Sequence, residues 1–207
     1  MEKDMEVNMA IYYCGNTPTP WGDWGESLIH GTLARNEKTG ERSIERVGPF
    51  TPAAYISYGS LIFTHPAKEA LKSSNLNGID RYEFLKKTRI VRLEWQHWDA
   101  KKPITDYLDL AGGPSTIIEN HKHDAELSKQ MPDYWQAFVS KKLSLSMLPD
   151  NESLSIGNYL KVIKADNDMD FFKGDIHGGY FVSERAKTWL ERHCPGCFTF
   201  SLIPFAD

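Results

Sequence analysis

Two stretches of the sequence, GSLIFTHPAKEAL at residues 59–71 and GGYFVSERAKTWL at residues 178–190, align with each other without a gap. Each contains three consecutive apolar residues, then a hydroxyl residue, then an Ala-Lys pair and a leucine. Three apolar residues in a row are typical of a buried strand, and a hydroxyl residue after them is a favoured helix N-cap. We therefore expect Thr64 and Ser183 to cap helices, with Ala67 and Ala186 packed closely against a sheet. Ala70 with Leu71, and Trp189 with Leu190, are expected to supply the packed face of these helices.

An aromatic-bearing strand is expected after each helix, at residues 79–85 and 198–203. The pattern suggests an internal duplication of strand-helix-strand units over residues 59–85 and 178–203, with a chance match as the alternative. The predicted fold class is α+β, a mixed α/β fold with a sheet packed by few helices. A chain of 207 residues fits a single domain, residues 1–207, whose core needs no disulfide or metal.

Local patterns predict further elements. A hairpin is expected where Gly40 ends the polar turn at residues 36–40, between two short strands within residues 26–47. Residues 9–14, 54–63 and 160–163 are each predicted to form one strand, because β-branched and aromatic residues are concentrated there. Helices are predicted at residues 66–74 and over residues 125–139, the latter despite Pro132.

Charge and hydropathy exclude several classes of protein. The formal net charge is −4, and the 24 Lys and Arg residues are spread along the chain, which does not favour nucleic acid as a partner. The first nine residues, MEKDMEVNM, have no apolar core of a secretory signal, and no apolar run approaches the roughly 18 residues of a membrane span. We therefore expect a cytoplasmic protein.

Cysteine and histidine patterns are the chemically informative short motifs. Cys194 and Cys197 have C-x-x-C spacing, but a second pair is missing, so partly buried turn cysteines are the favoured interpretation and no metal or cofactor is predicted. A metal-binding or redox role of this pair is the alternative. His121 and His123 are two residues apart, and His177 lies near Asp175. Surface histidines are the favoured interpretation, and a small hydrolase or transferase with a dispersed site around them is the alternative.

Nucleophile and phosphate motifs are missing from the sequence. There is no G-x-S-x-G, and residues 174–179 match no phosphate-binding pattern because they precede a strand instead of opening a helix. We predict a tight turn there and no enzymatic activity.

Acidic and aromatic residues favour protein binding, because acidic charge steers a basic partner and aromatic side chains anchor interfaces. A solvated acidic loop and ordinary core aromatics are the alternative interpretations. The candidate contact residues are Asp166, Asp168, Asp170, Phe171, Asp175, Trp95 and Trp98.

The C-terminal stretch from Gly174 to Phe205 resembles the end of immunity proteins from bacterial polymorphic toxin systems, the double-CXXCG and related immunity families. The likeness rests on Gly174-Asp175-Ile176, on the apolar strand and V-S-E-R cap over residues 180–187, and on the closing aromatic strand. The cysteine pairs that name the double-CXXCG family are not reproduced here, so no zinc is carried over. The resemblance implies a cytoplasmic, non-enzymatic protein that neutralises a cognate toxin by forming a stoichiometric complex with it, and we expect that toxin to have a basic surface.

Overall fold

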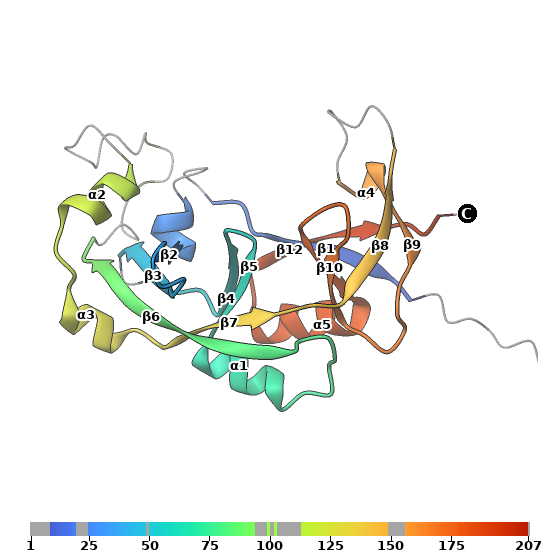
Figure 1. Ribbon diagram of the computed structural model, residues 1–207, viewed down its shortest axis with the longest axis horizontal. Coiled ribbons are helices and arrows are strands. Elements are labelled where there is room, and N and C mark those ends of the chain that lie inside the picture. Colours follow the sequence, from blue (N-terminus) through green and yellow to red (C-terminus); the bar gives the residue numbers. More distant parts are fainter. Residues whose placement is uncertain are drawn as a thin grey trace, which may run out of the picture. The chain divides into compact units, whose positions relative to one another are not determined.

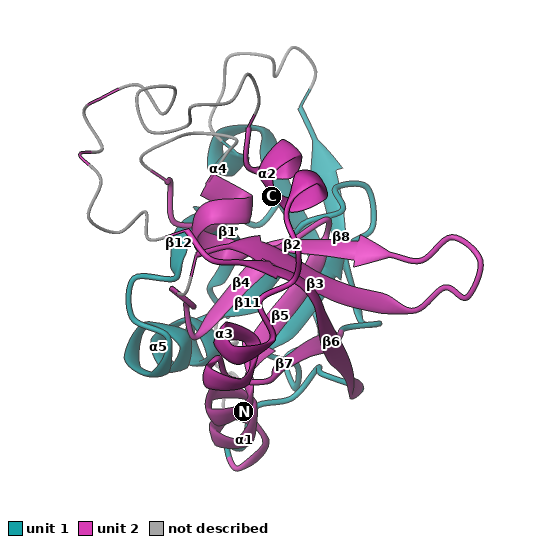
Figure 2. Cartoon of the chain, turned by 90° about the vertical axis from the view of Figure 1, so that its left-hand side faces the viewer, with its two compact units in different colours: residues 1–15, 74–80, 139–207 teal, residues 16–73, 81–138 magenta. Residues whose placement is uncertain are grey.

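The computed structural model describes residues 9–19, 25–48, 50–93, 99, 102, 113–148 and 156–206 (Figure 1). Its internal contacts divide the chain into two compact units, coloured separately in Figure 2: unit 1 comprises residues 1–15, 74–80 and 139–207, and unit 2 comprises residues 16–73 and 81–138. The described residues form twelve strands, five α-helices and one π-helix. The predicted α+β class is confirmed, with two six-stranded sheets where the sequence predicted one.

Unit 2 contains ten of these elements, six strands and four helices. Its strands are β2 (Thr32–Arg35), β3 (Arg42–Val47), β4 (Ala54–Ser57), β5 (Ser60–Thr64), β6 (Arg81–Val91) and β7 (Tyr134–Phe138). Its helices are the π-helix η2 (Glu26–His30), α1 (His65–Lys72), α2 (Pro114–Asn120) and α3 (Ala125–Gln130). The strand order in the sheet is β2-β3-β6-β7-β5-β4.

Unit 1 combines the first strand of the chain with the C-terminal third. Its strands are β1 (Ile11–Asn16), β8 (Lys142–Met147), β9 (Leu160–Lys164), β10 (Phe171–Gly174), β11 (Tyr180–Ser183) and β12 (Phe198–Ile203). Its helices are α4 (Ile156–Tyr159) and α5 (Glu184–His193). The strand order is β12-β1-β11-β10-β8-β9.

Each sheet curls until its two edges meet. In unit 1, Val162 of β9 forms a parallel bridge with Phe205, two residues beyond β12. In unit 2, the Leu33 amide of the edge strand β2 donates to the Ser57 hydroxyl of the other edge strand, β4, at 3.1 Å. Edge closure matters because an open edge leaves unpaired backbone groups available to other chains.

The two curled sheets have the same cyclic order. Starting from β2, unit 2 runs β2-β3-β6-β7-β5-β4; starting from β8, unit 1 runs β8-β9-β12-β1-β11-β10. Corresponding pairs have the same direction: β2/β3 and β8/β9 are antiparallel, as are β4/β5 and β10/β11, and β5/β7 and β1/β11. The strand order therefore recurs in the two units, as a duplication of the kind predicted would require, with β1 from the N-terminus in the position that β7 occupies in unit 2.

Two equivalent backbone hydrogen bonds show that Thr64 in unit 2 corresponds to Ser183 in unit 1. The Thr64 amide donates to the Ala53 carbonyl, and the Ser183 amide donates to the Asp170 carbonyl. The Ser183 hydroxyl caps α5 by accepting from the Ala186 amide, as predicted. Thr64 occupies the N-cap position of α1, but its hydroxyl donates to the Ala53 carbonyl instead, so the predicted side-chain cap is wrong for this copy.

Three predicted elements need correction. Residues 54–63 form a hairpin and not one strand, because Tyr58 and Gly59 both adopt positive φ, of 45° and 68°, and reverse the chain between β4 and β5. The helix expected over residues 125–139 ends at Gln130, before Pro132, and β7 follows it. Residues 26–30 form η2 instead of joining a strand.

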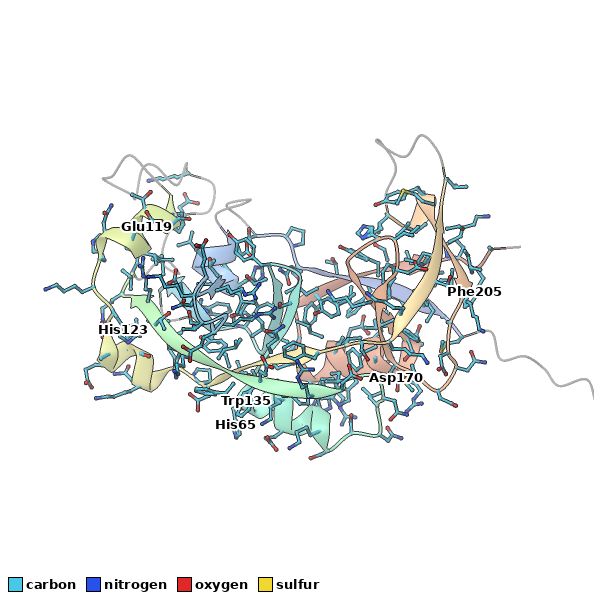
Figure 3. The ribbon with its side chains drawn as sticks, viewed as in Figure 1. His65, Glu119, His123, Trp135, Asp170 and Phe205 are labelled. Atoms are coloured by element: carbon cyan, nitrogen blue, oxygen red, sulfur yellow. The ribbon has the colours of Figure 1, made fainter. Side chains whose placement is uncertain are left out.

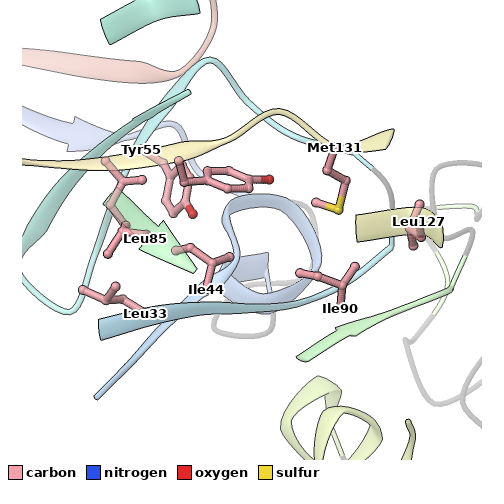
Figure 4. Close-up of a cluster of buried hydrophobic side chains, with 9 residues drawn as sticks. Leu33, Ile44, Tyr55, Leu85, Ile90, Leu127 and Met131 are labelled. Atoms are coloured by element: carbon pink, nitrogen blue, oxygen red, sulfur yellow. The ribbon is translucent and has the colours of Figure 1, made fainter. Parts of the chain in front are cut away.

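Each curled sheet encloses an apolar core. Figure 4 shows the cluster in unit 2, where side chains from the strands meet those of α3; its members are Leu33, Ile44, Tyr55, Ile62, Leu85, Ile90, Leu127, Met131 and Tyr134. The cluster in unit 1 consists of Ile11, Leu143, Leu145, Leu160, Val162, Phe172, Phe181 and Ile203. Full burial of each such side chain is worth roughly 1.5–3 kcal/mol, which makes these clusters the main source of stability.

A buried cation lies beside the core of unit 2. The Arg46 guanidinium is fully buried and donates to the carbonyls of Leu28 and Ile29 near the C-terminal end of η2, each at 3.1 Å. Carbonyl groups at a helix C-terminus carry partial negative charge, which offsets the cost of burying the guanidinium. His30 is stacked on Tyr55 nearby, and burial, with the charge of Arg46, lowers the pKa of His30 to about 4.

We predict that unit 2 loses stability on mild acidification. Between the ordinary His pKa of 6.5 and the folded value of about 4, the unfolded chain binds a proton at His30 that the folded chain does not. The free energy of unfolding therefore decreases as the pH falls through this window, and the contribution is fully present above it. Urea unfolding between pH 7 and pH 4 measures the slope. A His30→Gln variant should show a shallower slope, and an unchanged slope would contradict the assignment to His30.

Candidate protein-binding surface

The acidic residues chosen from the sequence do not form one surface. Asp166, in the loop before β10, forms an ion pair with the Lys141 ammonium at 2.5 Å, and the hydrogen bond from Lys141 lowers the pKa of this carboxyl. Asp168 is exposed in the same loop. Asp175 follows β10 and accepts a hydrogen bond from the Leu145 amide at 3.1 Å. The four-residue strand β10 separates Asp166 from Asp175, so the two carboxylates lie beyond opposite ends of that strand.

Asp170 and Phe171 are buried, each with 1% of its surface exposed, so neither fits the predicted role of a surface contact. The Asp170 carboxylate accepts from the Ser183 hydroxyl at 2.5 Å and from the Asn77 amide at 2.9 Å. The Arg185 guanidinium lies 3.7 Å from the same carboxylate. Asp170, labelled in Figure 3, therefore connects the segment around Asn77 with the start of α5 inside unit 1. The remaining two predicted contacts, Trp95 and Trp98, lie outside the described residues.

The cysteines and histidines have packing or hydrogen-bonding roles. Cys14, Cys194 and Cys197 are buried free thiols, and burial raises the pKa of Cys194 to about 12. Within the described ranges, no group of three or more His, Cys, Asp or Glu side chains is arranged to hold a metal ion.

The histidines of the enzyme alternative belong to different units. In unit 2, His121 Nδ1 lies 2.9 Å from the Ile117 carbonyl, and His123 Nδ1 accepts from the Ile90 amide at 3.0 Å. In unit 1, the His177 ring packs edge-on against Tyr13, and burial lowers its pKa. Each imidazole is thus accounted for by local contacts.

A lysine-aromatic cluster recurs in both units, with the lysine buried in unit 2 and partly buried in unit 1. In unit 2, the Lys68 ammonium lies 3.7 Å from the ring centre of Trp135, which in turn packs edge-on against Phe84 at 5.5 Å. In unit 1, the equivalent Lys187 lies 5.3 Å from the ring centre of Tyr12 and 5.9 Å from that of Phe200. Because both copies preserve this arrangement, we assign it to the packing of α1 and α5 on their sheets.

A groove lies on unit 1. It runs along α5 beside residues 75–76 and has a volume of about 400 Å³. The half-buried indole of Trp189 stacks on the His193 ring at a centroid distance of 4.4 Å and an interplanar angle of 18°. The residues that line the groove are Asn75, Leu76, Glu184, Arg185, Thr188, Trp189, Arg192 and His193.

Comparison of the two copies separates the residues that build the fold from those that do not. The buried alanines and leucines coincide, since Ala67 and Leu71 in α1 correspond to Ala186 and Leu190 in α5. The groove residues differ: Arg185, Trp189, Arg192 and His193 correspond to Pro66, Ala70, Ser73 and Ser74. Helix α1 packs on its sheet with Pro66 and Ala70 at the first two of these positions and ends at Lys72, before Ser73 and Ser74. Packing of the helix on its sheet therefore does not require the aromatic and cationic side chains found in α5.

This groove combines features that favour protein recognition. A rigid aromatic anchor with flanking arginines on a regular helix is the residue composition of interface hot spots. The sequence prediction missed it because Trp189 was assigned with Leu190 to the packed face of the helix. Leu190 is buried as predicted, whereas Trp189 is only partly covered. The available signal was the difference between Ala70 and Trp189 in the aligned stretches.

Comparison of the chain with family models, with curated proteins and with solved structures finds no match. Among the described helices, none is both long and apolar enough to cross a membrane.

The two neighbouring aspartates, Asp170 and Asp168, allow a matched test of this geometry. Asp170→Ala removes a buried acceptor that serves three groups, and we expect a loss of about 3 kcal/mol in the free energy of unfolding. Asp168→Ala removes an exposed carboxylate, and the expected change is below about 0.5 kcal/mol. Urea denaturation of the two variants measures both values. Equal losses would contradict the structural role of Asp170.

Proposed function

We propose that this chain is an immunity protein, which binds a cognate bacterial toxin in the cytoplasm of the cell that makes both and forms a stoichiometric inhibitory complex. The sequence resemblance suggested this function, and the α5 groove is the structural observation that supports it. Trp189 offers a large apolar contact at low conformational cost, and the flanking guanidinium groups offer directional hydrogen bonds.

The position of the groove on a regular element also suits tight binding. Helix α5 packs on β11 and β12, and its first turn is held by the Ser183 cap and by Asp170. A contact surface that is already ordered loses less conformational entropy when a partner binds. Inhibition then follows from occlusion of the toxin's active site or of the approach of its substrate, and no chemical step by this chain is needed.

The test is co-expression of this chain with the toxin domain encoded beside it, with bacterial survival and co-purification of the two proteins as readouts. We expect survival and a stable complex. Trp189→Ala should weaken the complex by at least about tenfold, because truncation of a central aromatic anchor costs about 2 kcal/mol or more. The α1 copy already carries alanine at the equivalent position, so the variant is expected to fold.

Two matched control variants show whether a loss of toxin binding is specific to substitutions in the α5 groove. Phe50→Ala truncates an exposed aromatic side chain in unit 2, and Arg35→Ser removes an exposed arginine there. Both variants should bind the toxin within about twofold of the unaltered protein. No rescue and no complex with the unaltered protein would reject the immunity function.

A further inference from the structure

The cationic groups of the α5 groove have a defined spacing along the helix. Arg185 and Arg192 are two turns apart, a separation of about 10 Å along the axis, and Trp189 lies between them. An extended chain rises about 3.3 Å per residue, so residues i and i+3 of a bound strand span the same distance. The groove therefore matches a segment with charged ends and apolar residues in the middle.

The positive charges of Arg185 and Arg192 are not neutralised by Glu184, the acidic residue that also lines the groove. Arg185 donates to the Asn75 carbonyl at 2.9 Å and lies 3.7 Å from the Asp170 carboxylate, yet about half of its side chain is exposed, at 55%. Arg192 is exposed and forms no ion pair with any of the described residues. Glu184, which also lines the groove, is engaged by the Tyr12 hydroxyl and by Lys187 at 3.5 Å. A guanidinium with free donors forms strong, often bidentate hydrogen bonds with carboxylates and phosphates.

Comparison with the other copy shows that the equivalent helix forms without the positive charges of Arg185 and Arg192. The positions of Arg185 and Arg192 are occupied by Pro66 and Ser73 in the other copy. On a chain whose formal net charge is −4, two arginines beside an indole form a local site of opposite sign. Such a site attracts a short acidic segment, while a long polyanion is repelled by the rest of the molecule.

We propose that the α5 groove binds an extended acidic segment of a partner protein, with two carboxylates three residues apart on Arg185 and Arg192 and apolar side chains against Trp189. This inference deepens and rests on the proposed immunity function, since it names the chemistry that the toxin presents. It also replaces the expected basic partner surface at this site, because the acidic side chains chosen from the sequence are buried, paired or separated.

The test uses the full chain and the peptide Ac-Glu-Phe-Phe-Glu-NH2, which has the same residue order in either direction. Its binding is followed by NMR through the indole N–H resonance of Trp189, assigned with a Trp189→Phe variant. We expect saturable shifts of this resonance and of the α5 amides, with a dissociation constant on the order of 0.1–1 mM for so short a ligand. The peptide Ac-Lys-Phe-Phe-Lys-NH2 should bind at least about fivefold more weakly.

Substitutions of single arginines test whether the acidic peptide binds at the α5 groove. Arg192→Ser, which installs the residue of the other copy, Ser73, should weaken binding of the acidic peptide about threefold to tenfold, and Arg35→Ser should leave it unchanged. Equal binding of the acidic and basic peptides, an Arg192→Ser variant that binds normally, or stronger binding of a dT8 oligonucleotide at α5 would overturn the proposal.

The peptide experiment needs no toxin, so its failure and that of the proposed function are distinguishable. Rescue by the unaltered chain without acidic-peptide binding would reject the groove chemistry and leave the immunity function. Binding of the acidic peptide at α5 without any rescue would reject the immunity function and support the groove as an acidic-segment site.

Discussion

The Asp170 carboxylate holds together the part of unit 1 on which the candidate site depends. It is buried, and it accepts hydrogen bonds from the Ser183 hydroxyl, which caps α5, and from the Asn77 amide. One wall of the groove is α5 and the other is residues 75–76, so a single carboxylate orders both walls. A buried carboxylate is costly unless hydrogen bonds satisfy it, and here the satisfied carboxylate also fixes the position of the neighbouring Arg185.

The strand order that recurs in the two units provides a control for function within the same molecule. Two curled sheets with one cyclic strand order, each packed by a helix that follows the same strand, show what the fold needs. Buried alanines, leucines and the lysine over an aromatic ring occur in both copies. Trp189 and the two arginines occur only in α5, so the fold that the two copies share does not require them, and recognition of a partner is the interpretation that uses all three.

The sequence predicted the elements whose signals are local. The aligned stretches located β5 with α1 and β11 with α5, because three apolar residues and a hydroxyl cap are read within a few positions. The closure of each sheet and the place of β1 beside β11 depend on pairings between distant residues, which no local pattern reveals. The Tyr58–Gly59 turn was missed because tyrosine at positive φ is uncommon and gives no turn signal. Asp170 was taken for a surface residue because an acidic run is normally solvated, and only its long-range partners explain its burial.

Hydrogen exchange of the full chain, alone and in complex with the toxin, tests the central claim most directly, because α1 and α5 serve as internal controls for each other. We predict that the proposed toxin partner slows exchange in α5, Glu184–His193, and at residues 75–76, and leaves α1, His65–Lys72, unchanged. Protection of α1, or of other surfaces without α5, would contradict the assignment of the partner site to the α5 groove.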